Sequence, residues 1–162
     1  MFHNRTFLVL SAAVLFVAVS QFSCSGTDAD KTTVDSSVYK SIWVGAPASE
    51  IPYYSRKDGE LIWYGHELIA NTSIYLGPKG TVMQISNGMN CQNCHLSAGT
   101  KPWGNNYGAV FSTYPKFRDR SGSIETIYKR VNDCFERSLN GESLDTGSKE
   151  MQAIYAYIKW LG

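Results

Sequence analysis

Five consecutive residues, Cys91-Gln92-Asn93-Cys94-His95, decide how this 162-residue chain folds. They match the C-x-x-C-H pattern, in which two thiols form thioethers with the vinyl groups of a haem and the histidine ligates its iron. A zinc ribbon would need a second pair of cysteines, and a thioredoxin-like site would need a βαβ setting. A structural disulfide would leave His95 unexplained. The motif therefore predicts one covalently attached haem c, held by Cys91, Cys94 and His95.

The segment around this motif has little periodicity. Between Thr72 and Arg120 lie 49 residues with six glycines and three prolines. A loop of this length without structure is unusual in a compact domain, and a large cofactor would supply the apolar surface that the loops lack. Five aromatic residues after the motif could line the haem or serve as ordinary core, namely Trp103, Tyr107, Phe111, Tyr114 and Phe117.

Helical patterns lie on both sides of this loop region. Apolar residues recur at helical spacing in three segments, which are residues 59–71, 123–139 and 148–161. Asp58 and Ser148 are suitable N-caps for the first and third, and Asn140-Gly141 is a suitable end for the second. No stretch shows the alternation expected of hairpin strands. We therefore expect an all-α domain with long loops that wrap the haem.

The start of the chain is typical of an export signal. Residues 1–23 combine a short polar start with the apolar run from Phe7 to Val19, which is too short to cross a bilayer comfortably. Cys24 follows a small residue, as in a bacterial lipoprotein signal, although Gln21 stands where an aliphatic residue is usual. The sequence thus predicts lipidation at Cys24. An ordinary signal peptide, cut after residue 20, is the alternative.

The polar residues that follow predict a domain on a tether. Residues 24–40 have little to bury and are expected to form a flexible tether. The monohaem cytochrome c domain is then expected over residues 41–162. This organisation places the domain in the periplasm, as a lipoprotein held at the membrane only through its lipid anchor.

Composition restricts the class of protein further. The chain is 43% hydrophobic, which is typical of a folded domain rather than a disordered one. Its net charge of +1 lacks the basic excess of nucleic-acid-binding proteins, so no nucleic-acid partner is expected. Its four cysteines are too few for a disulfide scaffold. Once Cys24, Cys91 and Cys94 are assigned, Cys134 remains.

The second axial ligand of the iron distinguishes a carrier from an enzyme. Ordinary electron-transfer cytochromes use Met or His, and the candidates in this chain are His66, Met83, Met89, Met151 and Cys134. His66 and Met151 lie on predicted helices, where ordinary surface or core roles are the default. Met89 is too close to the haem cysteines to reach the opposite face, whereas Met83 stays possible.

Cys134 lies near many basic residues in the sequence, which are Lys116, Arg118, Arg120, Lys129, Arg130 and Arg137. Cationic neighbours lower the pKa of a thiol and favour the thiolate. Arg130 and Ser138 lie four residues on either side of Cys134, so the three share one helix face and could hold a sulfur oxyanion. A small buried role for Cys134 and a solvated face for the arginines are the alternatives.

Five blocks extend this pattern from about Trp63 to the C-terminus: YGHELIANTSIYLGPKG, ISNGMNCQNCHLSAGTKPWGNNYG, STYPKFRDRSG, KRVNDCFERSLNG and SKEMQAIYAYIKWLG. They resemble the haem c thiosulfate dehydrogenases and, more distantly, the catalytic haem subunit of the Sox sulfur-oxidising complex. The resemblance implies a class I cytochrome c-like fold and axial ligation by His95 and Cys134. It also implies a catalytic set that comprises Cys134, Arg120, Arg130 and Ser138.

The resemblance implies an oxidoreductase that converts thiosulfate to tetrathionate, or the reverse. Members of the family commonly carry a second C-x-x-C-H motif, whereas this chain has one. Its electrons are therefore expected to leave to an external acceptor such as another cytochrome. Two alternatives are a pure electron carrier, with Met83 or Met151 as the iron ligand, and a subunit of a larger sulfur-oxidising complex.

Replacing Cys24 by serine tests the predicted anchor, because its thiol is the group that would carry the lipid. In a bacterial host that attaches haem c, we expect the wild type in the membrane fraction and Cys24→Ser in the soluble part of the cell envelope. Fractionation followed by haem staining measures this, with Ser36→Ala in the tether as the control. A Cys24→Ser protein that stays with the membrane would contradict lipidation.

Overall fold

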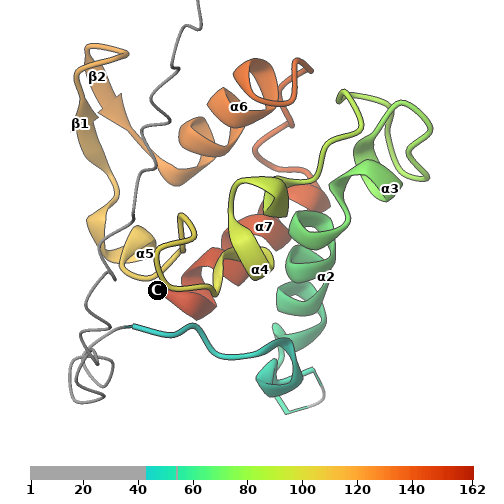
Figure 1. Cartoon of the computed structure of the whole chain (residues 1–162), viewed down its shortest axis with the longest axis vertical. Helices are drawn as coiled ribbons and strands as arrows, with labels where there is room; N and C mark the ends of the chain where they lie inside the picture. The colour runs from blue at the N-terminus through green and yellow to red at the C-terminus, as the bar shows by residue number, and fades with distance from the viewer. Residues whose placement is uncertain (1–42, 54) are drawn as a thin grey trace, which may run out of the picture. The chain divides into compact units, whose positions relative to one another are not determined.

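Helices α2 (Gly59–Ala70) and α7 (Lys149–Leu161) form the most extensive contact between two elements of the computed structural model (Figure 1). The helices are so close at Gly65 that a Cβ atom there would lie 2.0 Å from the carbonyl oxygen of Ala153. Only glycine allows this approach. The apolar stripes of both helices are buried here, and they form much of the core through residues such as Leu68, Met151 and Tyr157.

The structure describes residues 43–53 and 55–162. The predicted signal peptide over 1–23, its Cys24 and the tether over 24–40 lie outside this part, as does the start of the predicted domain at residue 41. These assignments therefore stay predictions. Within the described residues, every helix is too short or too polar to cross a membrane.

The long segment after α2 is not structureless. It contains the short helices α3 (Thr72–Leu76), η2 (Cys91–Asn93), α4 (Leu96–Gly99) and α5 (Val110–Thr113). A further short helix, η1 (Ala48–Glu50), precedes α2. Each has five residues or fewer, too few to give a periodic signal in the sequence. Long connections between them cover the rest of the segment, so the predicted loop-rich, mostly helical domain is confirmed.

The middle helix is shorter than predicted at both ends: a hairpin precedes it, and it stops at Arg137, before the predicted end at Asn140-Gly141. Strands β1 (Lys116–Arg118) and β2 (Ser123–Glu125) pair antiparallel, with Phe117 opposite Ile124. Helix α6 (Ile127–Arg137) begins only after Thr126, whose side-chain oxygen accepts a hydrogen bond from the Lys129 N–H at 3.2 Å. The expectation of no hairpin was therefore wrong here, since strands of three residues are too short to show alternation.

The predicted caps had mixed outcomes. Ser148 caps α7 as expected, because its hydroxyl oxygen accepts from the Met151 N–H at 3.2 Å. Asp58 occupies the N-cap position of α2 as expected, but its side chain makes no capping hydrogen bond. Its carboxylate instead accepts a hydrogen bond from Arg56 at 2.9 Å, so the ion pair takes the place of the cap.

The substitution Gly65→Ala tests the close crossing of α2 and α7. Helix propensity alone would make this change stabilising by about 1 kcal/mol. The added Cβ would, however, meet the Ala153 carbonyl, so we expect the free energy of unfolding to fall by about 2 kcal/mol. Denaturant unfolding of the haem-loaded protein measures this, with the exposed Glu60→Ala as control. A stabilised Gly65→Ala protein would show that the helices are not in contact there.

Candidate functional site

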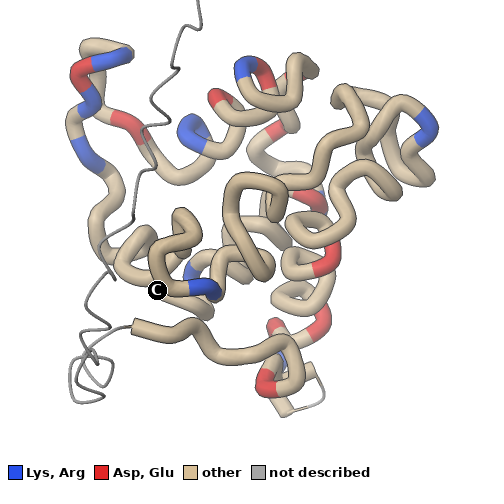
Figure 2. The backbone as a smooth tube through the Cα atoms, viewed as in Figure 1, with Lys and Arg blue, Asp and Glu red and all other residues tan. Residues whose placement is uncertain are grey.

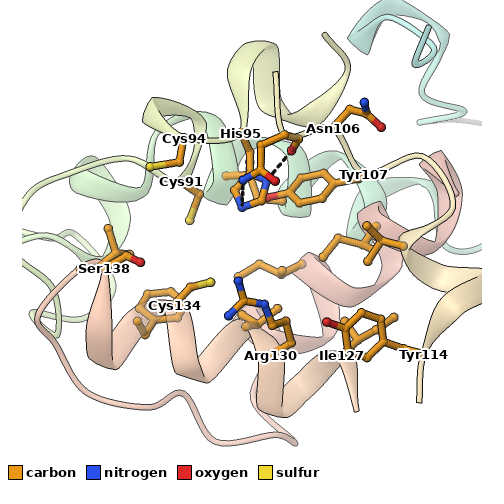
Figure 3. A pocket seen from close by; sticks show the side chains of 18 of the residues that line it. Cys91, Cys94, His95, Asn106, Tyr107, Tyr114, Ile127, Arg130, Cys134 and Ser138 are labelled. Carbon is orange, nitrogen blue, oxygen red and sulfur yellow. Dashed lines mark hydrogen bonds between the residues drawn. The ribbon is translucent and has the colours of Figure 1, made fainter. Parts of the chain in front are cut away.

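A cavity of about 280 Å³ lies between the haem-attachment motif and helix α6. This is close to the lower limit of roughly 300 Å³ for small-molecule sites, so the cavity is of ligand size. One wall carries the predicted attachment residues Cys91, Cys94 and His95, and the opposite wall carries Arg130, Cys134 and Ser138 (Figure 3). The structure thus brings together residues that lie more than thirty positions apart in the sequence.

Helix η2 and its neighbours hold the attachment motif in place. The Cys91 N–H donates to the Thr72 hydroxyl oxygen at 2.9 Å, and the Cys91 Sγ lies 3.2 Å from that oxygen. The His95 N–H donates to the Cys91 carbonyl at 3.0 Å, which folds the motif into a tight turn. Cys91 and Cys94 are both free thiols. Two free thiols and an imidazole on one cavity wall are the donor set that covalent haem c needs.

The imidazole of His95 is oriented by two neighbours. Its Nδ1 donates to the Asn105 carbonyl at 2.6 Å, and the ring of Tyr107 stacks on it with 4.5 Å between ring centroids. Nε2 has only a 3.5 Å contact with the Asn105 amide, so its lone pair is the one available for iron. Burial lowers the pKa of His95, and the charge of Arg130 lowers it further. The neutral imidazole, which is the form that ligates metals, is therefore favoured.

Cys134 lies on the cavity wall opposite the attachment motif. Figure 3 shows Cys134 and Arg130 extending from α6 into the cavity, toward Cys91 and His95. Met89 also lines the cavity, but on the chain segment next to Cys91. Because Cys134 comes from the opposite wall, it is the candidate that faces the attachment motif.

The other three candidate ligands have ordinary roles outside the cavity lining. Met151 is fully buried in the core, and Met83 packs against the core from its edge. His66 stacks on Trp63 with 5.5 Å between ring centroids and contacts Glu67 at 3.3 Å. The default roles expected for Met151 and His66 are confirmed, and the geometry does not support Met83 as a ligand.

Two opposing effects act on the Cys134 thiol. Burial raises its pKa, whereas the charges of Arg130 and Arg118 lower it. Burial is the larger effect, so the expected lowering by cations is present but does not prevail in the protein alone. Coordination to a metal favours the thiolate, because a ligating thiol is deprotonated.

The predicted catalytic residues fall into two groups. Arg130 and Ser138 line the cavity together with Cys134, as their helical spacing predicts. Arg120 lies outside the cavity lining, exposed in the turn between β1 and β2. Lys116 and Arg118 of strand β1 line the cavity instead.

The five aromatic residues that follow the motif also fall into two groups. Tyr107 and Tyr114 line the cavity, whereas Trp103, Phe111 and Phe117 do not.

Some residues of the site gave no signal in the sequence. Thr72, which contacts Cys91, lies nineteen positions before it, and Asn105 acts on His95 through a main-chain carbonyl that any residue would provide. Lys116 and Arg118 had a usable signal, since residues two apart on a strand share a face. That signal required the hairpin to be recognised first.

Comparison with known proteins shows which family and fold this chain resembles. The model of the SoxA/TsdA cytochrome c domain family matches residues 81–161. Among solved structures, the thiosulfate dehydrogenase TsdBA from Marichromatium purpuratum has a TM-score of 0.65 at 22% identity, covering 75% of this chain and 26% of that one. This likeness confirms the predicted cytochrome c-like fold.

Curated proteins give a similar result over parts of their length. Thiosulfate dehydrogenase from Psychrobacter arcticus is 43% identical over 77 residues, which cover 48% of this chain and 24% of that protein. Thiosulfate dehydrogenase from Thiomonas intermedia is 29% identical over 157 residues, which cover 95% of this chain and 48% of that protein. The chain therefore spans about half or less of these two relatives.

Spectroscopy of the oxidised, haem-loaded protein tests the ligand geometry. We expect the electron paramagnetic resonance signal of a low-spin His/thiolate haem, because Cys134 faces the attachment motif. This signal should disappear in Cys134→Ala and persist in the matched variants Met83→Leu and Met89→Leu. A far-red absorption band from Met-to-iron ligation, lost in one of the methionine variants, would rule out Cys134 as the ligand.

Proposed function

Because the chain belongs to the SoxA/TsdA cytochrome c domain family, we propose that it converts thiosulfate to tetrathionate, or the reverse, at one haem c ligated by His95 and Cys134. The observation that carries this proposal is the position of Cys134 and Arg130 across the cavity from His95 (Figure 3). A thiol and a guanidinium on the wall that faces the attachment motif provide a nucleophile and an anion-binding group together.

The residues of the cavity fit haem c. Cys91 and Cys94 supply the two thiols for covalent attachment, and His95 presents its Nε2, which has a weak 3.5 Å contact with the Asn105 amide. When bound, haem c supplies one-electron redox chemistry, so the two electrons of each turnover leave in single transfers to an external acceptor such as another cytochrome.

The proposed reaction balances through Cys134. A Cys134 thiolate forms a sulfur–sulfur bond with the outer sulfur of one thiosulfate, and this step releases two electrons to the acceptor. The outer sulfur of a second thiosulfate then attacks the sulfur that is attached to Cys134. This attack forms tetrathionate and restores the thiolate, which is the pattern of nucleophilic covalent catalysis.

Arg130 and Ser138 have supporting roles in this scheme. Both share the cavity face of α6 with Cys134. The guanidinium of Arg130 can donate two parallel hydrogen bonds to sulfonate oxygens, and the Ser138 hydroxyl can donate a third. Arg120 lies outside the cavity lining, and we assign no step to it.

The proposed setting of the protein follows from its sequence. The export signal and Cys24 support a periplasmic lipoprotein that is held at the membrane by its lipid. The C-x-x-C-H motif over Cys91–His95 supports one haem in this domain, and an acceptor such as another cytochrome would take its electrons. In this setting the protein would serve as the thiosulfate-reacting unit of a short electron-transfer chain.

Substitution of Cys134 tests the proposed function directly. Cys134→Ala removes the nucleophile, so we expect kcat for thiosulfate oxidation to fall by at least about 10³-fold with haem content unchanged. Arg130→Gln removes charge-assisted hydrogen bonds to the substrate, so kcat/KM should fall by about 10-fold or more. Assays with an artificial one-electron acceptor measure both.

Arg56→Gln is the matched control, because this arginine pairs with Asp58 at the exposed start of α2. It should retain full activity. Thiosulfate oxidation that persists undiminished in Cys134→Ala would end the proposal.

A further inference from the structure

Hairpin β1–β2 presents a second set of cations to the cavity, separate from Arg130 on α6. Lys116 and Arg118 both line the cavity, while Phe117 between them is 58% exposed. This alternation follows from the period of two along a strand, which sends successive side chains to opposite faces. Figure 2 shows that charged residues gather on this hairpin. The hairpin face toward the cavity is therefore cationic, and its other face is apolar.

Lys116 is held at the cavity wall by an aromatic ring. Its ammonium lies over the ring of Tyr114, with 4.8 Å from Nζ to the ring centroid. Tyr114 itself lines the cavity (Figure 3). This cation–π contact orders the flexible lysine side chain near the cavity and leaves its N–H groups free to donate to an anion.

Arg118 is held by a buried carboxylate. Glu125 on β2 is only 2% exposed, and its Oε2 lies 3.6 Å from the Arg118 Nε. Its Oε1 lies 3.4 Å from the Lys129 Nζ. Glu125 Oε2 has no hydrogen-bond partner among the described residues, so its contact with Arg118 is an attraction between charges rather than a hydrogen bond.

This arrangement leaves Arg118 able to bind an anion. A guanidinium has five N–H donors, and the contact with Glu125 involves only its Nε edge. Glu125 shares its charge with Lys129, which also pairs with Asp133 at 3.2 Å. Together with Lys116, the group has three cations and two carboxylates, an excess of one positive charge. Glu125 thus orients Arg118 without neutralising the hairpin.

The proposed reaction needs more than one anion-binding group. The second thiosulfate dianion must approach the sulfonate of the first, which is already bound to Cys134, and the repulsion between these anions opposes the approach. Arg130 lies one helical turn from Cys134 and can accompany one anion. A second anionic group needs cations of its own, and the hairpin places Lys116 and Arg118 on the wall of the same cavity.

We propose that Lys116 and Arg118 form a second anion subsite, which holds the far sulfonate of a ligand with two sulfonate ends while Arg130 holds the near one beside Cys134. The natural ligand, a second thiosulfate or the far end of tetrathionate, rests on the proposed function. The subsite itself rests only on the hairpin and its charges.

Binding of an unreactive ligand tests the subsite independently of the proposed reaction. The probe is 1,2-ethanedisulfonate, which has two sulfonates separated by two atoms, as tetrathionate has, but no sulfur–sulfur bond to react. Methanesulfonate is the matched probe with one sulfonate. Calorimetric titration of the oxidised, haem-loaded protein should show that the wild type prefers the disulfonate.

The variants Lys116→Gln and Arg118→Gln should each raise the Kd for 1,2-ethanedisulfonate by about tenfold, the size expected for a lost charge-assisted hydrogen bond. Their affinity for methanesulfonate should stay within about twofold of the wild type, because Arg130 is intact. Arg130→Gln should weaken binding of both probes. The controls Lys79→Gln and Arg56→Gln remove exposed cations that lie outside the cavity lining and should bind both probes as the wild type does.

Two results would overturn the subsite: a wild type with no preference for the disulfonate, or unchanged disulfonate binding in both hairpin variants. Neither of these two binding results depends on turnover of thiosulfate. A protein that shows the expected binding pattern but does not oxidise thiosulfate would refute the proposed function and support the subsite. A protein that oxidises thiosulfate but whose hairpin variants bind the disulfonate normally would refute the subsite and support the proposed function.

Discussion

The close approach of helices α2 and α7 is the constraint on which the rest of the domain depends. At Gly65 the carbonyl of Ala153 leaves no room for a Cβ atom. Helix α2 leads through a single residue into α3, so the crossing also fixes Thr72, which binds the Cys91 N–H. Helix α7 contributes Ile154 and Ile158 to the cavity wall. One helix contact therefore positions both the attachment motif and the apolar surface beside it.

The sequence is informative where chemistry or periodicity constrains it locally. Thioether attachment requires the spacing of Cys91, Cys94 and His95, so the motif by itself identifies one wall of the cavity. Helical periodicity then predicts that Arg130 and Ser138 share the face of Cys134, and all three lie on the opposite wall. Neither inference needs information about distant parts of the chain.

The remainder of the site depends on contacts that leave no such pattern. Arg118 and Arg120 are two positions apart, so alternation would place both on one face; β1 ends at Arg118, and of these two arginines Arg118 lines the cavity. The carbonyl of Asn105 orients His95 through a group common to every residue. At Cys134 the sequence indicates the cations correctly, but the opposing effect of burial is visible only in the folded protein. Tertiary structure decides all three cases.

The junction between β2 and α6 determines how the cavity can change its width. Strand β2 ends at Glu125, α6 begins at Ile127, and Thr126 between them is fixed by its hydrogen bond to the Lys129 N–H. A link of one capped residue leaves β2 and α6 little freedom to change their relative orientation. Because β1 pairs with β2, this link also restricts how far the hairpin cations can move from the face of α6 that carries Cys134. Under the proposed subsite, such a restricted separation would select ligands by the distance between their charged ends, and so would distinguish sulfur chains by length rather than by total charge.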